Sequence, residues 1–343
     1  IEIFNTGAGK IFNIAASEII GKKLALENAS DLKLGVLAKV IFQSLATLVI
    51  RQSPEGIYPQ VVDISFTDPS LELRVATDRM LNPKGEVMGF LKIIKDRTRE
   101  IELIKSKSEF ITVAAHQLRT PLSAVSWAIQ SLKSEKLSDS QKELLTTGEA
   151  AAGNLLKIVE DLLKIATIEE GKFGYNFKEI DLVAFLQSVL NQALPVAKEY
   201  NINLYLEPPK EISLSVGADP EKLVLAVSNL LENSIKYNIP NGRVVVSVER
   251  QADAPFVQIN ISDTGIGIPP EAMDKLFSKF FRAENALTKE TTGSGLGLYI
   301  VKNIITRHGG KIWAESEAGR GTAFHFILPT DSRLIPQKEI RNS

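Results

Sequence analysis

The spacing of apolar residues divides the chain into three segments with different periods. In the first segment, residues 1–97, apolar and polar residues alternate in short runs, and this alternation predicts strands at residues 3–5, 61–66, 71–75 and 89–94. Pro and Gly interrupt the runs at 68–69 and 82–85, where we expect turns. These patterns predict a small α+β module, in which helices come first and an antiparallel meander follows.

The second segment has a helical period. From Ile101 to Leu132, apolar residues recur at alternating steps of three and four, which is the a/d spacing of a coiled coil. Ser138 and Asp139 then supply a helix cap, and residues 144–165 repeat the spacing with a second apolar seam beside the first. One partner helix cannot cover so wide an apolar arc. We therefore expect residues 98–170 to form a helical hairpin that pairs with a second copy as a four-helix bundle.

The third segment, residues 171–330, mixes both periods and predicts an α/β domain. The expected elements are a helix from Asp181, a strand at 202–206, a helix capped by Asp219 with Pro220 at its first position, strands at 244–248 and 257–262, a helix after Leu296, and closing strands at 311–314 and 322–328. The last residues, 331–343, are polar, and we expect a frayed tail there.

Composition removes several functional classes. Forty basic and 41 acidic residues give a net charge of −1, so we expect no nucleic-acid partner. The chain has no cysteine, which excludes disulfides, thiolate metal sites and a cysteinyl-flavin photosensor. The three histidines lie too far apart in the sequence to predict a local metal motif.

The longest apolar stretch, residues 40–50, is far shorter than the roughly 20 residues of a membrane helix. We therefore expect no membrane contact in this segment and a cytoplasmic location. The chain opens on Ile1 without Met or a leader, so we expect a piece of a longer protein, and any membrane anchor would lie upstream.

Three motifs in the last segment carry candidate chemistry. Asn229 and Asn233 are four residues apart on one predicted helix face, where two amide oxygens can complete an octahedral Mg²⁺ site, and Lys236 lies one turn further on. Asp263 follows an apolar strand, and its carboxylate can accept a hydrogen bond from an exocyclic amine such as that of adenine. Glycines at 293, 295 and 297 open a helix and leave backbone N–H groups for phosphate.

Taken singly, each motif has an ordinary structural explanation: an amphipathic helix, a tight turn and a flexible loop. Other phosphate motifs do not fit, because Gly9-Lys10 lacks the P-loop spacing and neither Gly-rich loop has the dinucleotide pattern. The sequence therefore favours a magnesium–nucleotide site of another design.

In their order, these motifs and residues 276–282 resemble the N, G1, F and G2 boxes of the sensor histidine kinases, and residues 319–324 resemble the closing strand pair of the same Bergerat-type α/β-sandwich fold. The resemblance implies that Asn229 and Asn233 hold Mg²⁺, Lys236 touches phosphate, Tyr237 packs on the base, Asp263 reads adenine and residues 284–294 form a lid. By the same resemblance, the ATP site also includes Gly265, Gly267, Phe281, Arg282, Gly293, Gly295, Gly297, Leu298 and Thr322.

Residues 108–122 resemble the phosphoacceptor box of the same family, with His116 as the acceptor. Ala115 and Leu118 occupy the seam, so His116 should face solvent, where a neutral imidazole nitrogen can attack a γ-phosphate. Pro121 should kink the helix nearby. The other histidines, His308 and His325, are interpreted as structural.

One position departs from the family pattern. Gln117 stands where Glu or Asp usually follows the acceptor, and an amide cannot take the ring proton near neutral pH. Our hypothesis is that autophosphorylation is slower than it would be in Gln117→Glu. Thr120 matches the family position that positions water to dephosphorylate a partner regulator.

Residues 1–97 resemble a PAS domain without its usual first strand. No histidine precedes His116, which excludes histidine-ligated haem there. The resemblance as a whole implies a homodimer that uses ATP and Mg²⁺ and passes phosphate to an aspartate of a response regulator receiver domain.

Two rival functions remain open at this point. An ATPase of the topoisomerase or mismatch-repair kind would place a Glu four residues before the metal-binding Asn, but Asn229 occupies that place and Glu232 is expected to face elsewhere. A pseudokinase that only transmits a signal has Gln117 as its one support.

Overall fold

The structure is a computed structural model that describes residues 1–42, 48–51, 58–135, 137–207, 214–251, 254–289, 293–336 and 340–341. The chain divides into two compact units, one made of residues 1–106 with the end of the chain and the other of residues 107–336. Among the described helices, none is both long and apolar enough to cross a bilayer.

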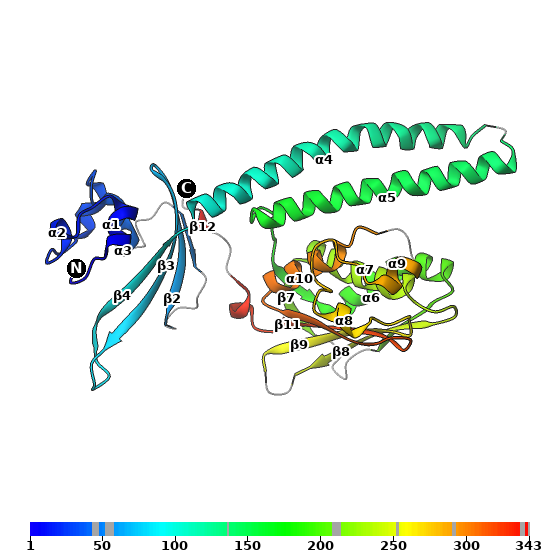
Figure 1. Cartoon of the computed structure of the whole chain (residues 1–343). Helices are drawn as coiled ribbons and strands as arrows, with labels where there is room; N and C mark the ends of the chain where they lie inside the picture. Colours follow the sequence, from blue (N-terminus) through cyan, green and yellow to red (C-terminus); the bar gives the residue numbers. More distant parts are fainter. Residues whose placement is uncertain are drawn as a thin grey trace. The chain divides into compact units, whose positions relative to one another are not determined.

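The first unit places short helices on one face of an antiparallel sheet (Figure 1). Its helical elements are α1 (Thr6–Phe12), α2 (Ala16–Ile19), the 3₁₀ turn η1 (Leu26–Ser30) and α3 (Gly35–Ile41). Its sheet has the order β12 (Ile340–Arg341), β1 (Leu48–Arg51), β2 (Gln60–Thr67), β3 (Ser70–Leu81) and β4 (Val87–Asp96). The meander β2–β3–β4 confirms the predicted strands.

The strand predicted at residues 3–5 is wrong. These residues precede α1, and the Asn5 side chain accepts a hydrogen bond from the Ala8 N–H as the cap of that helix. Alternation over so few residues does not outweigh a helix cap. Strand β1 was not expected, because its apolar residues belong to a longer run without alternation.

A hydrophobic core joins the helices to the sheet of this unit. Phe12, Ile19 and Leu37 pack on the strand residues Ile64 and Val75. Because side chains alternate along each strand, residues two apart share the face that the helices cover.

The helical hairpin consists of α4 (Thr98–Leu132) and α5 (Asp139–Glu169). Ser138 begins α5 with the predicted cap, since its hydroxyl accepts a hydrogen bond from the Gln141 N–H and the Gln141 side-chain oxygen accepts one from the Ser138 N–H. Helix α4 continues through Pro121. The two helices meet closely where Gly148 faces the Ile129 side chain.

The hairpin leaves much of its apolar surface uncovered. On α4 only Ser108 and Ala115 are buried. The exposed apolar side chains from residue 107 onward are Phe110, Val113, Leu118, Val125, Trp127 and Leu132 on α4, and Leu144 and Leu155 on α5. A surface of this kind on a soluble helix indicates a further partner.

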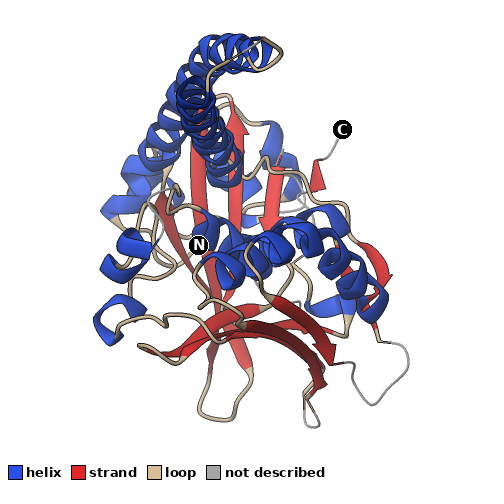
Figure 2. Cartoon of the chain, turned by 90° about the vertical axis from the view of Figure 1, so that its right-hand side faces the viewer, coloured by secondary structure: helices blue, strands red, loops and turns tan. Residues whose placement is uncertain are grey.

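The remainder of the second unit, which we call the lobe, packs helices on a five-stranded sheet. The helices are α6 (Leu182–Glu199), α7 (Pro220–Lys236), α8 (Pro270–Met273), α9 (Glu284–Lys289) and α10 (Gly297–Arg307). The sheet has the order β10 (Lys311–Glu317), β11 (Gly321–Pro329), β9 (Phe256–Asp263), β8 (Arg243–Arg250) and β6 (Asn203–Glu207), and β5 (Lys178–Asp181) pairs separately with β7 (Ser215–Ala218). Figure 2 shows the helices on one side of this sheet.

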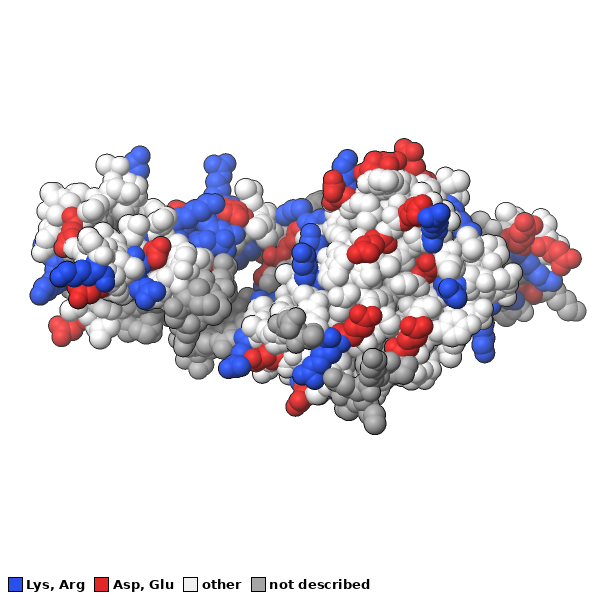
Figure 3. All heavy atoms as spheres, turned by 90° about the horizontal axis from the view of Figure 1, so that it is seen from below, with Lys and Arg blue, Asp and Glu red and all other residues white. Residues whose placement is uncertain are grey.

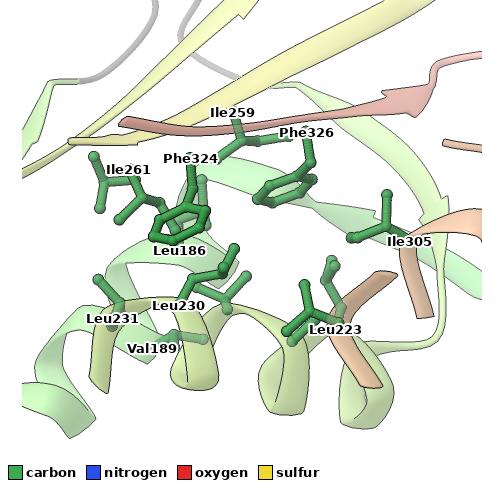
Figure 4. Packing of buried hydrophobic residues seen from close by; sticks show 14 of the residues in the cluster. Leu186, Val189, Leu223, Leu230, Leu231, Ile259, Ile261, Ile305, Phe324 and Phe326 are labelled. Carbon is green, nitrogen blue, oxygen red and sulfur yellow. The ribbon is translucent and has the colours of Figure 1, made fainter. Parts of the chain in front are cut away.

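Leucine, isoleucine and phenylalanine side chains fill the space between the lobe's helices and sheet (Figure 4). Leu230 on α7, Ile259 on β9 and Phe326 on β11 are all fully buried. Truncating one such side chain to Ala costs about 2–5 kcal/mol, so this core holds the loops at its edge in place. Acidic and basic side chains are interspersed on the face in Figure 3, in line with the near-zero net charge.

The first residues of the predicted tail are ordered against the lobe. Residues 332–334 form a 3₁₀ turn, and the Leu334 carbonyl lies against Gly309. A side chain at Gly309 would collide with that carbonyl, and its φ of 78° also favours glycine.

Candidate functional site

A cavity of about 1170 Å³, including its open mouth, lies in the second unit. The predicted residues that line it are Asn229, Asn233, Lys236, Tyr237, Asp263, Gly267, Phe281, Arg282, Gly293, Gly295, Gly297, Leu298 and Thr322. Segments that are far apart in the sequence are thus brought around one space.

Helix α7 supplies one wall of the cavity. Its cap is Asp219, whose carboxylate accepts the Lys222 N–H, and Pro220 occupies the first position as predicted. The Asn229 amide nitrogen donates to the Leu225 carbonyl at 2.8 Å, which leaves its amide oxygen free to face the cavity. Asn233 lies one turn further along the same wall.

Asp263 lies at the end of β9, at the floor of the cavity. Its Oδ1 accepts the N–H groups of Gly265 at 2.8 Å and Thr322 at 3.1 Å. Burial raises the pKa of the Asp263 carboxyl to about 6, although these two hydrogen bonds oppose the shift. The carboxyl is therefore close to half-ionised at the lower end of the physiological pH range.

Gly265 is the one predicted nucleotide residue that the structure does not place in the cavity lining. It lies behind Asp263, where an added Cβ would come 2.5 Å from the Tyr237 carbonyl oxygen. The glycine is thus required for a close backbone approach beneath the cavity.

The loop before α10 packs directly on the backbone of residues 280–281. Gly295 has a φ of 67°, and a Cβ there would lie 2.8 Å from the Phe280 carbonyl carbon. Arg282 crosses the same loop, donating from its guanidinium to the Gly293 carbonyl at 3.3 Å and the Ala286 carbonyl at 3.5 Å. These contacts hold the loop at the mouth of the cavity.

The predicted lid, residues 284–294, is described in part. Helix α9 covers residues 284–289, and Asn285 donates from its side-chain amide to the Gly267 carbonyl at 2.8 Å. Residues 290–292 lie outside the described residues.

Helix α5 supplies a wall that the sequence did not predict. Asn154, Lys157 and Asp161 line the cavity, and Asp161 accepts a hydrogen bond from the Ser294 hydroxyl at 3.0 Å. Periodicity identifies the faces of a helix but not which neighbour covers each face, so no signal in the sequence marked these residues.

The expectation that Glu232 faces elsewhere is wrong, because Glu232 also lines the cavity. Its carboxylate accepts a hydrogen bond from Lys157 at 2.7 Å and lies 3.8 Å from the Lys236 ammonium. Successive helix residues differ by about 100° in direction, and this cavity is wide enough to include both Glu232 and Asn233. Two lysines hold the carboxylate, so it is poorly placed to activate water.

His116 is exposed on α4, as its position beside the buried Ala115 predicts. Gln117 and Thr120 are also exposed, and the Thr120 hydroxyl donates to the His116 carbonyl at 3.4 Å. Among the described residues that line the cavity, none comes from α4. The ring and the cavity are therefore separate in this arrangement.

Both parts of the site match known families. The family described as "His Kinase A (phospho-acceptor) domain" matches residues 106–171, and the family described as "Histidine kinase-, DNA gyrase B-, and HSP90-like ATPase" matches residues 218–332. The chain belongs to the sensor histidine kinases.

Curated relatives of this histidine kinase chain carry the names of sensor proteins. It is 27% identical over 327 residues to the sensor histidine kinase WalK of Bacillus subtilis, covering 94% of this chain and 52% of WalK. It is 34% identical over 290 residues to drug sensory protein A of Synechocystis, covering 81% of this chain and 43% of that protein. The chain thus spans about half the length of the curated relatives it matches.

A solved structure is also similar to this chain. The crystal structure of full-length ShkA in complex with AMPPNP matches with a TM-score of 0.54 and 27% identity, covering 64% of this chain and 45% of that one.

The residues of this kinase also suit a magnesium ion. The amide oxygens of Asn229 and Asn233 are hard neutral ligands, and the Asn229 side chain is oriented by its bond to Leu225. Within the described parts of the chain, no group of three or more His, Cys, Asp or Glu side chains could hold a metal by itself. This donor set fits an ion that takes most of its ligands from phosphates and water.

The remaining histidines of this kinase have structural surroundings. His308 is fully buried; its Nε2 accepts the Asp219 N–H at 3.0 Å, and its Nδ1 lies 2.8 Å from the Ile304 carbonyl. Burial lowers the pKa of the His308 imidazole. His325 stacks on Trp313, and its Nδ1 lies 2.7 Å from the Asn260 side-chain oxygen.

Proposed function

We propose that this chain is an ATP-dependent protein-histidine kinase that phosphorylates His116 and passes the phosphoryl group to an aspartate of a response regulator. The observation that carries the proposal is the gathering of the amide pair on α7, the carboxyl at the end of β9 and the glycine loop before α10 around one cavity. An exposed histidine on the hairpin of the same unit is the acceptor.

The cavity binds ATP with its base on the sheet side. Asp263 accepts a hydrogen bond from the adenine amino group, and Tyr237 packs on the base. Lys236 and the N–H groups before α10 bind the phosphates, where the start of the helix attracts negative charge.

Asn229 and Asn233 hold Mg²⁺ through their amide oxygens. The ion, when bound, offsets the charge that develops on the leaving ADP.

The phosphoryl transfer is a single displacement at phosphorus. The lone pair of a neutral His116 ring nitrogen forms a P–N bond, while the bond from the γ-phosphorus to the β–γ bridging oxygen breaks and ADP leaves with that electron pair. The ring then loses its other N–H proton to water. The Gln117 amide can orient the ring but does not accept this proton.

The acceptor hairpin works as a homodimer. Support comes from the exposed apolar side chains of α4 and α5, which a second hairpin would cover in a four-helix bundle. The exposed surface around His116 then receives the regulator, and Thr120, one turn from the ring, positions water when the kinase dephosphorylates its partner.

The first unit is a PAS-like sensor module. The first support is the order of its elements, in which short helices precede an antiparallel sheet. The second is its direct connection to the hairpin, because Arg97 alone separates β4 from α4. A change in the sheet therefore has a short path to the hairpin.

Incubation with γ-labelled ATP and magnesium tests the kinase activity. We expect acid-labile, alkali-stable label that is lost in His116→Ala and in Asn233→Ala. His325→Gln is the matched control, because it changes a histidine outside the cavity, and it should keep the label. Release of free phosphate without labelled protein, or neither product, would reject the proposal in favour of an ATPase or a scaffold.

A further inference from the structure

The inner face of the first unit's sheet, which faces α1–α3, changes from apolar to cationic along β3 and β4. Val75 on β3 pairs with Ile94 on β4 within the hydrophobic core. Two residues further along each strand, Thr77 pairs with Lys92. Because side chains two apart share a face, this polar pair directly borders the core.

The Lys92 ammonium lies at this edge of the core, and its hydrogen-bond partner is a hydroxyl and not a carboxylate. Its Nζ donates to the Thr77 hydroxyl at 3.0 Å, and Thr77 is only 8% exposed. Burial alone lowers the pKa of Lys92. Among the ion pairs of the described residues, none includes Lys92, whereas Arg74 on the opposite face is paired with Asp63 at 2.7 Å.

Thr77 and Lys92 together have several hydrogen-bond donors close to one another that the described residues leave unused. The ammonium has two further N–H groups, and the Thr77 hydroxyl, whose oxygen already accepts from Lys92, still has its proton to donate. A carboxylate can accept from both groups at once, and such charge-assisted bonds are stronger than neutral ones.

The next pair along the strands supplies an aromatic wall. Arg79 pairs with Phe90, the Phe90 ring lies 6.3 Å from that of Tyr58, and the Arg79 guanidinium lies 4.3 Å from the centre of the Tyr58 ring. Phe90 is 57% exposed. A flat or short apolar group could cover this ring and remove it from water.

We propose that the inner face of this sheet binds a small carboxylate with an apolar body, whose charge lies at Lys92 and Thr77 and whose body lies on Phe90 and Tyr58. Lys92 is four residues before Asp96, where β4 ends, so the ligand would act on the strand that leads into α4. This regulatory consequence rests on the proposed kinase function, but the binding itself does not.

Calorimetric titration of the full chain tests the site with phenylacetate and hexanoate as probes, and with their neutral amides as matched controls. At least one carboxylate should bind saturably and neither amide should. Lys92→Met should weaken that binding at least about tenfold, since hydrogen bonds to charged groups contribute roughly 1.5–3 kcal/mol. Thr77→Val should weaken it less. Lys95→Met, which removes an exposed ammonium on the same strand, should leave it unchanged.

A second measurement separates binding from a purely structural role. Binding of the carboxylate should raise the pKa of Lys92, and NMR of the isotope-labelled Lys92 ammonium measures this pKa. If neither carboxylate binds, or if Lys92→Met binds it as well as wild type, the proposal is wrong and Lys92 merely ends the core. Labelling of His116 from γ-labelled ATP, measured on the same samples, distinguishes the two failures, because it persists when only the carboxylate site is wrong and is absent when the kinase proposal is wrong.

Discussion

Asp263 is buried at the floor of the cavity, and its raised pKa has a measurable consequence. In the role that we propose for Asp263, adenine recognition requires the ionised carboxylate, and the carboxyl is half-ionised at about pH 6. Between pH 7 and pH 5 the ionised fraction falls about tenfold. We therefore expect AMPPNP affinity to fall by a similar factor as the pH is lowered over this range.

Titration calorimetry at several pH values measures this dependence. Asp263→Asn should bind weakly at all pH values and lose the step near pH 6, while Asp274→Asn, at an exposed aspartate, should keep it. A step that persists in Asp263→Asn would show that another group controls adenine binding.

Gln117 allows a test of the acceptor chemistry. A carboxylate in its place could take the ring proton as phosphate arrives, so Gln117→Glu should raise the initial rate of His116 labelling, by up to the 10²-fold typical of general bases. Gln130→Glu adds the same charge elsewhere on exposed α4 and should not change the rate. Equal or slower labelling in Gln117→Glu would contradict the hypothesis.

Individual site residues could be predicted from the sequence where the chemistry of the ligand requires a specific residue type. The Asn229 and Asn233 amides, the Asp263 carboxyl and the glycine loop follow from what magnesium, adenine and phosphate require, and the other nucleotide positions follow from the family resemblance. All the predicted nucleotide residues except Gly265 line one cavity. Lys157 and Asp161 were missed, because their place depends on how α5 packs against the lobe, which no local pattern encodes.

At the scale of elements, the imidazole of His308 joins two helices of the site. It ends α10 and accepts the N–H of Asp219, the cap of α7. The Asp219 carboxylate also accepts the Asn176 N–H at 2.6 Å, so the segment after α5 is tied to the same point. Protonation of the ring would remove the acceptor and place a charge in the core.

The pH dependence of unfolding tests this junction. The pKa of His308 is lower in the folded state than the unfolded value of about 6.5. The stability it contributes is therefore present above pH 6.5 and is lost as the pH falls below it. In urea unfolding, His308→Gln should lose less stability than wild type between pH 7.5 and 5.5.

His116→Gln serves as the control for that experiment, because it replaces an exposed histidine and should keep the wild-type slope. An unchanged slope in His308→Gln would mean that other groups cause the acid sensitivity.

Long elements with a clear period were predicted well from the sequence, because burial of one face repeats over many residues. Helices α4, α5 and α7 begin at the expected caps or patterns. Some short ones were not: β1 was missed and a strand at residues 3–5 was wrong, since so few residues carry little periodic information.

At the scale of the second unit, polar contacts hold the lobe against α5. Lys157 bonds to Glu232, Asp161 to Ser294 and Glu169 to Lys279. Because α4 contributes no residue to the described cavity lining, the lobe must leave this arrangement, or serve a second copy, before His116 meets ATP.

Glu169→Gln tests whether this docking slows the reaction. Glu169 and Lys279 lie outside the cavity lining, so AMPPNP affinity should not change. Glu169 also lies 3.8 Å from the Lys107 ammonium on α4, but only its pair with Lys279 joins α5 to the lobe. Loss of that partly exposed pair, of up to about 1 kcal/mol, should raise the initial rate of His116 labelling by up to about fivefold. Glu170→Gln breaks the nearby pair with Lys172 and should leave the rate unchanged; a slower Glu169→Gln would mean that docking assists catalysis.

Hydrogen bonds around Arg97 fix the connection between β4 and α4. The Arg97 N–H donates to the Glu72 carbonyl, Glu72 in turn donates its N–H to the Thr98 hydroxyl, and Asp96 accepts from that same threonine. These three hydrogen bonds tie the start of α4 to β3 and to the end of β4. Each residue inserted in α4 between Arg97 and His116 would rotate the direction of the His116 side chain about the helix axis by about 100°, and about seven inserted residues would bring it back to within roughly 20° of its original direction.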